Sequence, residues 1–382
     1  MKLLGALLYF SIFINSALAE FSFLHRSPEA LMMGDAFTAV ADDENTLFYN
    51  PAALGRNRGL SIVPLKPNIA VPDVLDKELS LDNPGVGISD RFEDFPSDAE
   101  GIADRVLGYP LYLEVAAAPS IKLLNFGFNF FAVSKTSMDL QNAIHPVLNI
   151  DYRLDRGFIT GYAFNFGNGG QGRNPAGHRS TIGIGLKTMN RQGLTGTFDL
   201  FGTELLDIIQ DSDDYKSVRK NLGYSKGSGF GFDLGFEHNI FMGPTRLTFG
   251  AAWLDIGNTS FDKDEGDFAI PDQEQSLNLG ASFNQDLGLL DYTLAIDYSN
   301  ALDVQSATAS KVKLGARARL PFIDLYTGYN GGYASWGLGI KAFFVDLKLG
   351  FYGIELGRRF RQREGKRTVL TISLAEINFD AF

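Results

Sequence analysis

Apolar residues alternate with small or polar residues along most of this 382-residue chain. The clearest segment is 230–237, where aromatic or aliphatic side chains at even positions alternate with glycine or acidic residues at odd positions. The same period of two recurs at 182–187, 247–253, 292–298 and 336–341. Because successive side chains of a strand point to opposite faces, this pattern predicts β-strands. Repeated in segments of about ten residues, it is typical of a transmembrane β-barrel, in which closure pairs every backbone group.

We predict an all-β, transmembrane antiparallel β-barrel of about 14, and up to 16, strands with a short helical N-terminal hatch in the lumen. The candidate strands are 58–70, 110–119, 121–134, 145–154, 157–167, 179–190, 193–201, 227–239, 245–256, 275–284, 289–299, 311–320, 323–331, 334–344, 345–357 and 367–379. The short turns are expected at 119–120, 155–157, 191–193, 240–244, 284–288 and 321–322. The long connections are expected at 71–109, 135–144, 168–178, 202–226, 257–274 and 300–310. Short periplasmic turns and long outer loops are typical of outer-membrane barrels.

A soluble β-sandwich or propeller is the alternative, because its strands alternate too. The apolar faces here are rich in Phe, Tyr and Trp, as an aromatic girdle would be. Helix signals in two long connections, 97–107 and 203–209, would pack over the barrel mouth or form an apolar landing site for a lipid-like ligand. The alternation of the last strand changes phase near Ala375 and Glu376, which indicates a bulge or an early strand end.

The first 19 residues have the features of a signal peptide. Lys2 provides a positive start, 3–14 is apolar, and Ala17-Leu18-Ala19 is a small-residue cleavage site. The alternative, an anchoring helix, is disfavoured because the run is short for a bilayer. We therefore expect a signal peptide at 1–19, a hatch at 20–57 and a barrel at 58–382.

Composition narrows the function further. The chain contains no cysteine, so neither disulfides nor thiolate metal sites stabilise it. Removing Lys2 with the signal peptide takes the net charge from −11 to −12, which argues against nucleic acid as a partner. Beyond residue 19, no run of 18 apolar residues predicts a transmembrane helix.

The segment 20–57 is not strand-like. Ser27-Pro28-Glu29 predicts a helix start, and 30–40 a short helix interrupted by Gly34. Gly34-Asp35-Ala36-Phe37-Thr38-Ala39-Val40, followed by Leu47-Phe48-Tyr49-Asn50-Pro51-Ala52, resembles the hatch of the long-chain fatty acid transporter (FadL) superfamily, which includes shuttle-type members. Over the barrel the resemblance is weak, and it depends on 231–235 and on the spacing of the closing strands from Lys311 onward.

The resemblance implies a hatch that plugs a 14-stranded barrel, with ligand leaving sideways through a kinked strand. It makes Phe21 and Phe23 candidates for occupying a hydrophobic pocket. Gly34, Asp35, Asn50, Pro51 and Ala52 form the hatch motif, and the last three would anchor it at the wall. The alternative is that these three only shape the plug. The basic residues Lys135, Arg153 and Lys187 are scattered and form no cluster for a carboxylate.

No catalytic or metal motif is evident. The four histidines, His25, His145, His178 and His238, lack metal-ligand spacing. His178 beside Arg179 and Ser180 is the one position where rim chemistry could be sought, and a solvated loop histidine is the simpler interpretation. The acidic run 262–267 resembles a calcium loop only loosely and is more typical of a charged outer loop. We expect no catalytic residues, no metal and no cofactor.

The sequence therefore favours an outer-membrane channel for hydrophobic small molecules such as a fatty acid. A non-transporting barrel that serves as a secretion or surface-anchoring partner is the alternative, and a diffusion porin is disfavoured because the hatch would obstruct it. Expected partners are outer-membrane lipid, a hydrophobic ligand, the barrel assembly machinery and, in the alternative, an outer-membrane protein. The expected location is the outer membrane of a Gram-negative-type bacterium.

Overall fold

The computed structural model describes residues 23–57, 59–73, 110–141, 147–170, 176–199, 222–342, 345–357, 359–374 and 377–380. The expected signal peptide, Phe21, His145 and the two helix signals at 97–107 and 203–209 lie outside these ranges. Within them, no helix is both long and apolar enough to cross a membrane.

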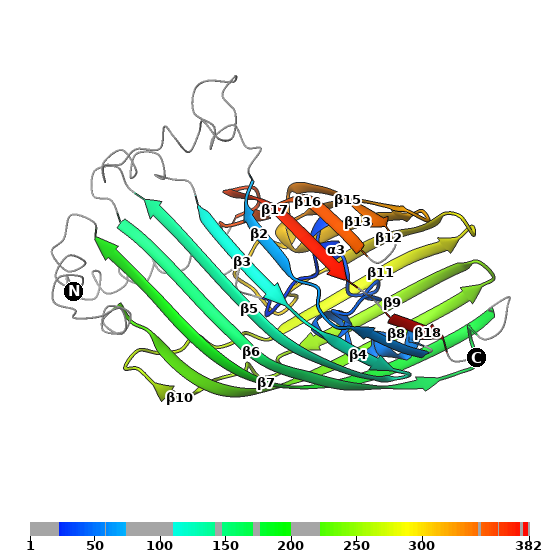
Figure 1. Cartoon of the computed structure of the whole chain (residues 1–382), viewed down its shortest axis with the longest axis horizontal. Helices are drawn as coiled ribbons and strands as arrows, with labels where there is room; N and C mark the ends of the chain where they lie inside the picture. The colour runs from blue at the N-terminus through cyan, green and yellow to red at the C-terminus, as the bar shows by residue number, and fades with distance from the viewer. Residues whose placement is uncertain are drawn as a thin grey trace, which may run out of the picture.

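Antiparallel strands form a closed wall (Figure 1). In chain order they are β1 (Gly59–Val63), β2 (Asn68–Pro72), β3 (Leu111–Ala117), β4 (Ser120–Leu123), β5 (Phe126–Gln141), β6 (Val147–Phe166), β7 (Ala176–Asp199), β8 (Ser225–Met242), β9 (Thr245–Leu254), β10 (Asp262–Glu265), β11 (Ser276–Asp286), β12 (Asp291–Tyr298), β13 (Val312–Arg319), β14 (Ile323–Asn330), β15 (Tyr333–Ala342), β16 (Val345–Glu355), β17 (Glu364–Leu374) and β18 (Ile377–Asp380). A 3₁₀ turn, η2 (Thr308–Lys311), precedes β13.

Four of the wall strands consist of two segments each: β1 with β2, β3 with β4, β9 with β10, and β17 with β18. Counted this way, the barrel has 14 strands, within the predicted range. It closes where β2 pairs with β17 and β1 with β18. The all-β barrel prediction is confirmed.

Two predicted turns are wrong, which explains why sixteen candidate strands become fourteen. Residues 155–157 pair without a break inside β6, and 191–193 inside β7. Both are polar triplets that contain glycine, a composition typical of turns. Such triplets also occur within strands that continue beyond the bilayer. A third predicted turn, 119–120, is a break between β3 and β4, and the chain turns after Leu123 instead. With the corrected count, β6 ends and β7 begins at the short-turn end, so the prediction of a long outer loop at 168–178 is wrong.

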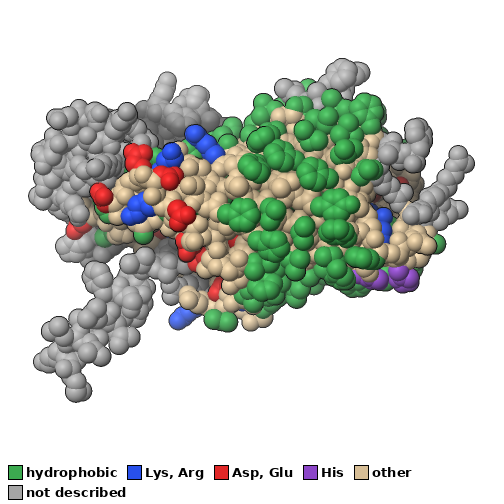
Figure 2. Space-filling view, turned by 90° about the horizontal axis from the view of Figure 1, so that it is seen from below, with side chains coloured by type: hydrophobic (Ala, Val, Ile, Leu, Met, Phe, Trp, Pro, Cys, Tyr) green, Lys and Arg blue, Asp and Glu red, His purple; other side chains and the backbone are tan. Residues whose placement is uncertain are grey.

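The outer face of the wall is apolar. Phe230, Leu294 and Trp336 expose 61%, 51% and 54% of their surface, whereas Asp233 and Glu237, on the opposite face of β8, are fully buried. Figure 2 shows apolar side chains gathered in a band on one face of the molecule, with charged groups beyond it. Leaving so much apolar surface in water would cost about 25 cal/mol per Å². A band of this kind is the lipid-facing surface of a transmembrane barrel.

The N-terminal segment lies inside the barrel, where Figure 1 shows α3 enclosed by the strands. It comprises α3 (Pro28–Met32), α4 (Thr46–Tyr49) and the 3₁₀ helix η1 (Pro51–Arg56). Nearly all its described residues are buried, and its apolar side chains form much of the core. We call residues 23–57 the hatch. The end of the barrel with turns at 124–125, 243–244 and 320–322 is the short-turn end, and the opposite end is the long-loop end.

Candidate functional site: the hatch and the long-loop cavity

The first hatch helix is shorter than predicted. It begins at Pro28 as expected, but it ends at Met32 and does not continue to Val40. Gly34 and Asp35 both have positive φ, 64° and 61°, which reverses the chain at this point. The side chain of Ser27 does not cap its own helix, because its hydroxyl donates to Asp43 at 2.6 Å.

The turn at Gly34 fits closely against the wall. A Cβ at Gly34 would lie 2.4 Å from the backbone nitrogen of Tyr329 on β14, so only glycine allows this approach. The next residue, Asp35, accepts from Lys313 Nζ at 2.5 Å and lies 3.7 Å from Arg26 Nε. Burial opposes ionisation of Asp35, but Lys313 and Arg26 lower its pKa below the ordinary value. Backbone fit and charge therefore fix the hatch at the same position.

Asn50, Pro51 and Ala52 lie against β7 and β8. Asn50 accepts from the Ala52 amide at 3.0 Å and donates to the carbonyl oxygen of Phe236 on β8 at 3.3 Å. Pro51 begins η1 and contributes no amide donor. A Cβ at Gly235 would lie 2.2 Å from Asn50 Oδ1, so the wall leaves space for this corner. The motif thus contacts the wall directly.

An ion network holds the hatch at the short-turn end. Glu29 on α3 lies 2.6 Å from Lys348 Nζ and 3.4 Å from Arg317 Nη1. Asp42 lies 2.9 Å from Arg317 and 3.1 Å from Arg319. Glu29, Lys348 and Arg317 are buried, so removal of one of these partners leaves an uncompensated buried charge, whereas Asp42 and Arg319 are partly exposed. We call these five residues the hatch lock.

Asp43 follows Asp42 of the hatch lock in sequence, but the charged groups that act on it most are carboxylates and not cations. It accepts from the Ser27 hydroxyl and from the Asn45 amide at 2.9 Å. Burial, followed by the nearby Glu44 and Glu29 carboxylates, raises the pKa of Asp43 to about 7. This hatch carboxylate therefore titrates near neutral pH.

Phe23 lies at the other end of the hatch. Two cations lie close to its ring, with Arg26 Cζ at 4.8 Å and Lys313 Nζ at 4.9 Å from the centroid. Its carbonyl oxygen accepts from Lys135 at 2.6 Å, so one of the scattered basic residues positions the hatch. Only 7% of Phe23 is exposed.

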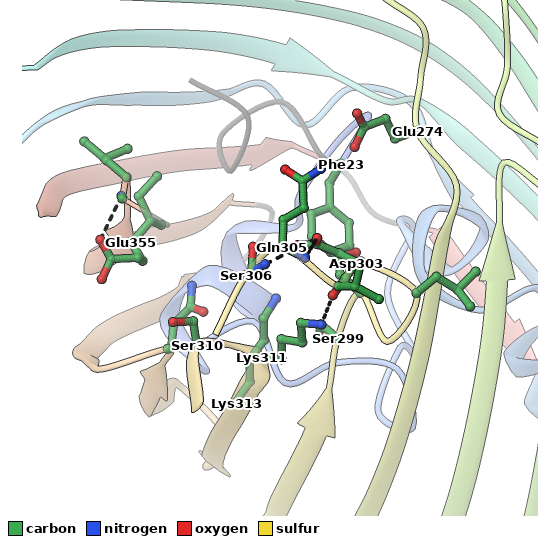
Figure 3. Close-up of a pocket in the computed structure, with 18 of the residues that line it drawn as sticks. Phe23, Glu274, Ser299, Asp303, Gln305, Ser306, Ser310, Lys311, Lys313 and Glu355 are labelled. Carbon is green, nitrogen blue, oxygen red and sulfur yellow. Dashed lines mark hydrogen bonds between the residues drawn. The ribbon is translucent and has the colours of Figure 1, made fainter. Parts of the chain in front are cut away.

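Phe23 faces a cavity of about 490 Å³ at the long-loop end. We call it the long-loop cavity, and its size is in the range of small-molecule sites. Figure 3 shows Phe23 and Gln305 near its centre, with Glu274 and Glu355 on opposite sides. The apolar lining residues are Phe23, Leu302, Val304, Ile354 and Leu356, and the cationic ones are Arg26, Lys311 and Lys313. The acidic lining residues are Glu274, Asp303 and Glu355, so the cavity presents apolar surface together with charges of both signs.

Sequence reasoning missed the basic residues of this cavity. Arg26, Lys311 and Lys313 are far apart in sequence or lie on different elements, and only the barrel brings them together. Two basic residues considered from the sequence are used elsewhere. Arg153 pairs with Asp151 at 3.0 Å. Lys187 Nζ lies 2.9 Å from both Asp233 and Asp255. Neither lines the cavity.

The wall is interrupted beside the hatch. β1 ends before Pro64, and β2 begins after Pro67, while Pro119 separates β3 from β4. The ladder between these strands covers 60–63 and 68–70 and omits the residues between. On the adjoining side, β17 ends and β18 begins at the phase change predicted near Ala375 and Glu376. Proline has no amide donor, so the ladder cannot continue here.

A buried ion pair lies behind this break. Lys66 Nζ is 3.2 Å from Glu44 Oε2 of the hatch, and both side chains are almost fully buried. Leu65, in contrast, exposes 51% of its surface. We call residues 64–67 and 118–119 the wall break.

Two other sequence candidates have ordinary surroundings. The acidic run at 262–267 includes the exposed strand β10, which pairs with β8. His178 lies within β7, not in a loop, and is stacked near His238. Across the described ranges, no group of three or more His, Cys, Asp or Glu side chains is arranged to hold a metal ion.

Comparisons with known proteins show what this chain is similar to. A family model described as "Family of unknown function (DUF5723)" matches residues 176–270. No curated protein sequence matches the chain. Solved structures similar to this chain include the CymD monoaromatic hydrocarbon channel, with 13% identity, a TM-score of 0.49, and coverage of 94% of this chain and 99% of that chain.

Two toluene transporters are similar to the chain as well. TbuX from Ralstonia pickettii is 10% identical with a TM-score of 0.48, and TodX from Pseudomonas putida is 11% identical with a TM-score of 0.44. Each comparison covers 93% of this chain and 98% of the other. At these identities the likeness concerns the fold.

Proposed function

We propose that this protein is an outer-membrane channel that transports hydrophobic small molecules, with long-chain fatty acids as candidate ligands. The observation that supports it most is the long-loop cavity, with Phe23 near its centre. The apolar lining residues would hold an acyl chain or ring, and burial of that surface provides about 25 cal/mol per Å². Lys311 and Lys313 line the cavity, and a ligand carboxylate would have to share them with Asp35 and with the Asp303 carbonyl oxygen.

The wall break supports a sideways exit. The hatch lock fills the direct path with paired charges, which an apolar ligand crosses only at high cost. At the wall break, by contrast, the backbone ladder is already open. On this proposal the ligand displaces Phe23, passes Lys66 and Glu44, and enters the membrane through the wall break, between the paired segments β1–β4 and β2–β3. The protein would reside in the outer membrane after insertion by the barrel assembly machinery.

The test is binding and uptake by Phe23→Ala. We expect the substitution to enlarge the cavity and to change the Kd for a fluorescent fatty acid at least fivefold, measured on the detergent-purified barrel. Phe322→Ala is the matched control, since this ring is 72% exposed at the short-turn end. Mass spectrometry of the wild-type barrel should find a copurified acyl or aromatic compound. Absence of any such compound together with equal binding by both variants contradicts the proposal.

A secretion or surface-anchoring barrel is the second candidate. The hatch lock favours it, because a barrel that only holds a protein partner does not require the hatch to move. Crosslinking in intact cells followed by purification under denaturing conditions separates the two functions. A stoichiometric protein partner on a barrel without copurified ligand supports the second candidate, and unchanged uptake after deletion of residues 20–45 argues against the channel.

A further inference from the structure

Two turns at the short-turn end have large apolar side chains at their tips. The turn 287–290 joins β11 to β12, and the turn 320–322 joins β13 to β14. Leu289 and Phe322 expose 77% and 72% of their surface. The other strongly exposed residues of these turns are Leu287 and Leu320. We call the two segments the apolar turns. Exposed apolar surface of this kind indicates an apolar partner outside the barrel.

The strands that join these turns to the long-loop end are short for a bilayer. β12, β13 and β14 have 8 residues each. At ~3.3 Å per residue and a tilt of about 40°, such a strand rises roughly 20 Å along the barrel axis. The lipid-facing band of a transmembrane barrel is about 25 Å tall. Part of the band on this side of the barrel must therefore come from residues beyond the ends of the strands.

The residues at the two ends of these strands show which end extends the band. At the long-loop end, the strands meet polar residues and glycines, as at Asn300, Ser310 and 330–332. Leu302 and Val304, which are also exposed at that end, line the long-loop cavity. At the short-turn end, the same strands run directly into the apolar turns. The missing height is therefore available at the short-turn end.

The charged residues beside the apolar turns belong to the lumen face. Asp324 at the start of β14 is almost fully buried, and Arg319 at the end of β13 is part of the hatch lock. Asp291 accepts from the buried amide group of Asn284 at 2.7 Å, and the register places Asp286 directly opposite Asp291 on the same face. The outward surface thus continues from the apolar band to the tips of the turns without a charge from these four residues.

The backbone of the apolar turns is suited to a medium without water. The amides of residues 287–289 all donate to carbonyl or carboxylate oxygens within 286–290, at 2.8 to 3.2 Å. In the other turn, the Leu320 amide donates to the carbonyl oxygen of Ile323 at 2.9 Å, and Pro321 has no amide hydrogen. Unpaired backbone donors are excluded from hydrocarbon because water cannot compensate them there. This pairing is a second indication, independent of the side chains, that the turns contact lipid.

We propose that the apolar turns lie among the acyl chains of the adjacent membrane leaflet, which in an outer membrane is the periplasmic leaflet. Lipid is therefore the partner of this surface, since the surface is continuous with the lipid-facing band. Immersion of both turns gives the short side of the barrel the full height of the band and fixes the depth of that edge in the bilayer. The inference depends on membrane insertion and not on transport.

Spin labelling in phospholipid vesicles measures the depth of the turns. The chain contains no cysteine, so Leu289→Cys and Phe322→Cys each provide a single site for a nitroxide. Collision rates are measured with oxygen, which concentrates in hydrocarbon, and with a water-soluble nickel complex. We expect the ratio of oxygen to nickel collisions at both sites to be at least fivefold higher than at Val304→Cys. Val304 is the matched control, because it is an exposed apolar residue at the opposite end.

Leu294→Cys on the outer face of β12 is the reference for hydrocarbon, and electrophoresis with and without heating confirms that each variant is folded. The inference is overturned if either turn gives the ratio of Val304→Cys while Leu294→Cys gives the hydrocarbon ratio. The turn would then be in water and open to a periplasmic protein. A water ratio at Leu294→Cys as well would instead overturn membrane insertion, and the proposed function with it.

Discussion

Gly34 and Gly243 have the same φ, +64°, but different surroundings. A Cβ at Gly34 would overlap the backbone of β14, whereas a Cβ at Gly243 meets nothing within 4 Å. Alanine at either position adopts a left-handed conformation, at a cost of about 1–2 kcal/mol. Gly34→Ala must in addition push the hatch away from the wall, so we expect much faster proteolysis of residues 23–57 in detergent. Gly243→Ala should leave hatch cleavage at the wild-type rate, and equal cleavage of both variants would contradict the packing argument.

Asp43 predicts a pH dependence of hatch docking. Its pKa is raised to about 7 in the folded state, from an ordinary value near 4. The folded protein therefore holds a proton that the released hatch loses, and docking weakens as the pH rises from about 4 to 7. The protection factors of the hatch amides, which correct for the intrinsic pH dependence of hydrogen exchange, should fall across this range and then level off. Asp43→Asn keeps the hydrogen bond from Ser27 and should remove most of the change.

The residues of the hatch show what sequence can and cannot reveal. The helix start at Pro28 and the corner at Asn50 are local features, so their sequence signals sufficed. The positive φ of Asp35 was missed because a non-glycine residue there depends on its partners on β13 and in the hatch. The basic lining of the long-loop cavity was missed for the same reason, since it exists only after the barrel closes.

At the scale of elements, the periodic strands were predictable and their ends were not. Alternation of apolar and polar residues is found in the wall strands. The strands also continue across polar triplets such as 191–193, whose composition predicts a turn. Strands β6 and β7 have 20 and 24 residues, against 8 in β12 and β13. A strand needs about 9–11 residues to cross a bilayer, so the long strands extend past it at the long-loop end. Figure 1 shows this extension on one side of the barrel only.

The hatch lock predicts how firmly the hatch, as an element, is held. Glu29→Gln removes the charge that pairs with Lys348 and Arg317 and leaves both cations without this carboxylate. We expect the variant barrel to open more often, seen as at least a fivefold rise in open probability in planar bilayers. Glu265→Gln on the exposed strand β10 is the control and should behave as wild type. A closed Glu29→Gln barrel would show that backbone fit alone retains the hatch.

At the scale of the whole molecule, the apolar band determines where the protein can fold. Leu294 lies near the middle of β12 and is 51% exposed, whereas Val304 is 92% exposed in the loop that follows. Lysine on the lipid face costs about 2–4 kcal/mol at the bilayer midplane and little near the interfaces. Leu294→Lys should therefore sharply reduce insertion into lipid vesicles, measured by the shift in electrophoretic mobility on heating, while Val304→Lys inserts normally. If Leu294→Lys inserted as well as wild type, or if the barrel folded as a soluble monomer without detergent, the band would be facing water and the transport proposal would lose its basis.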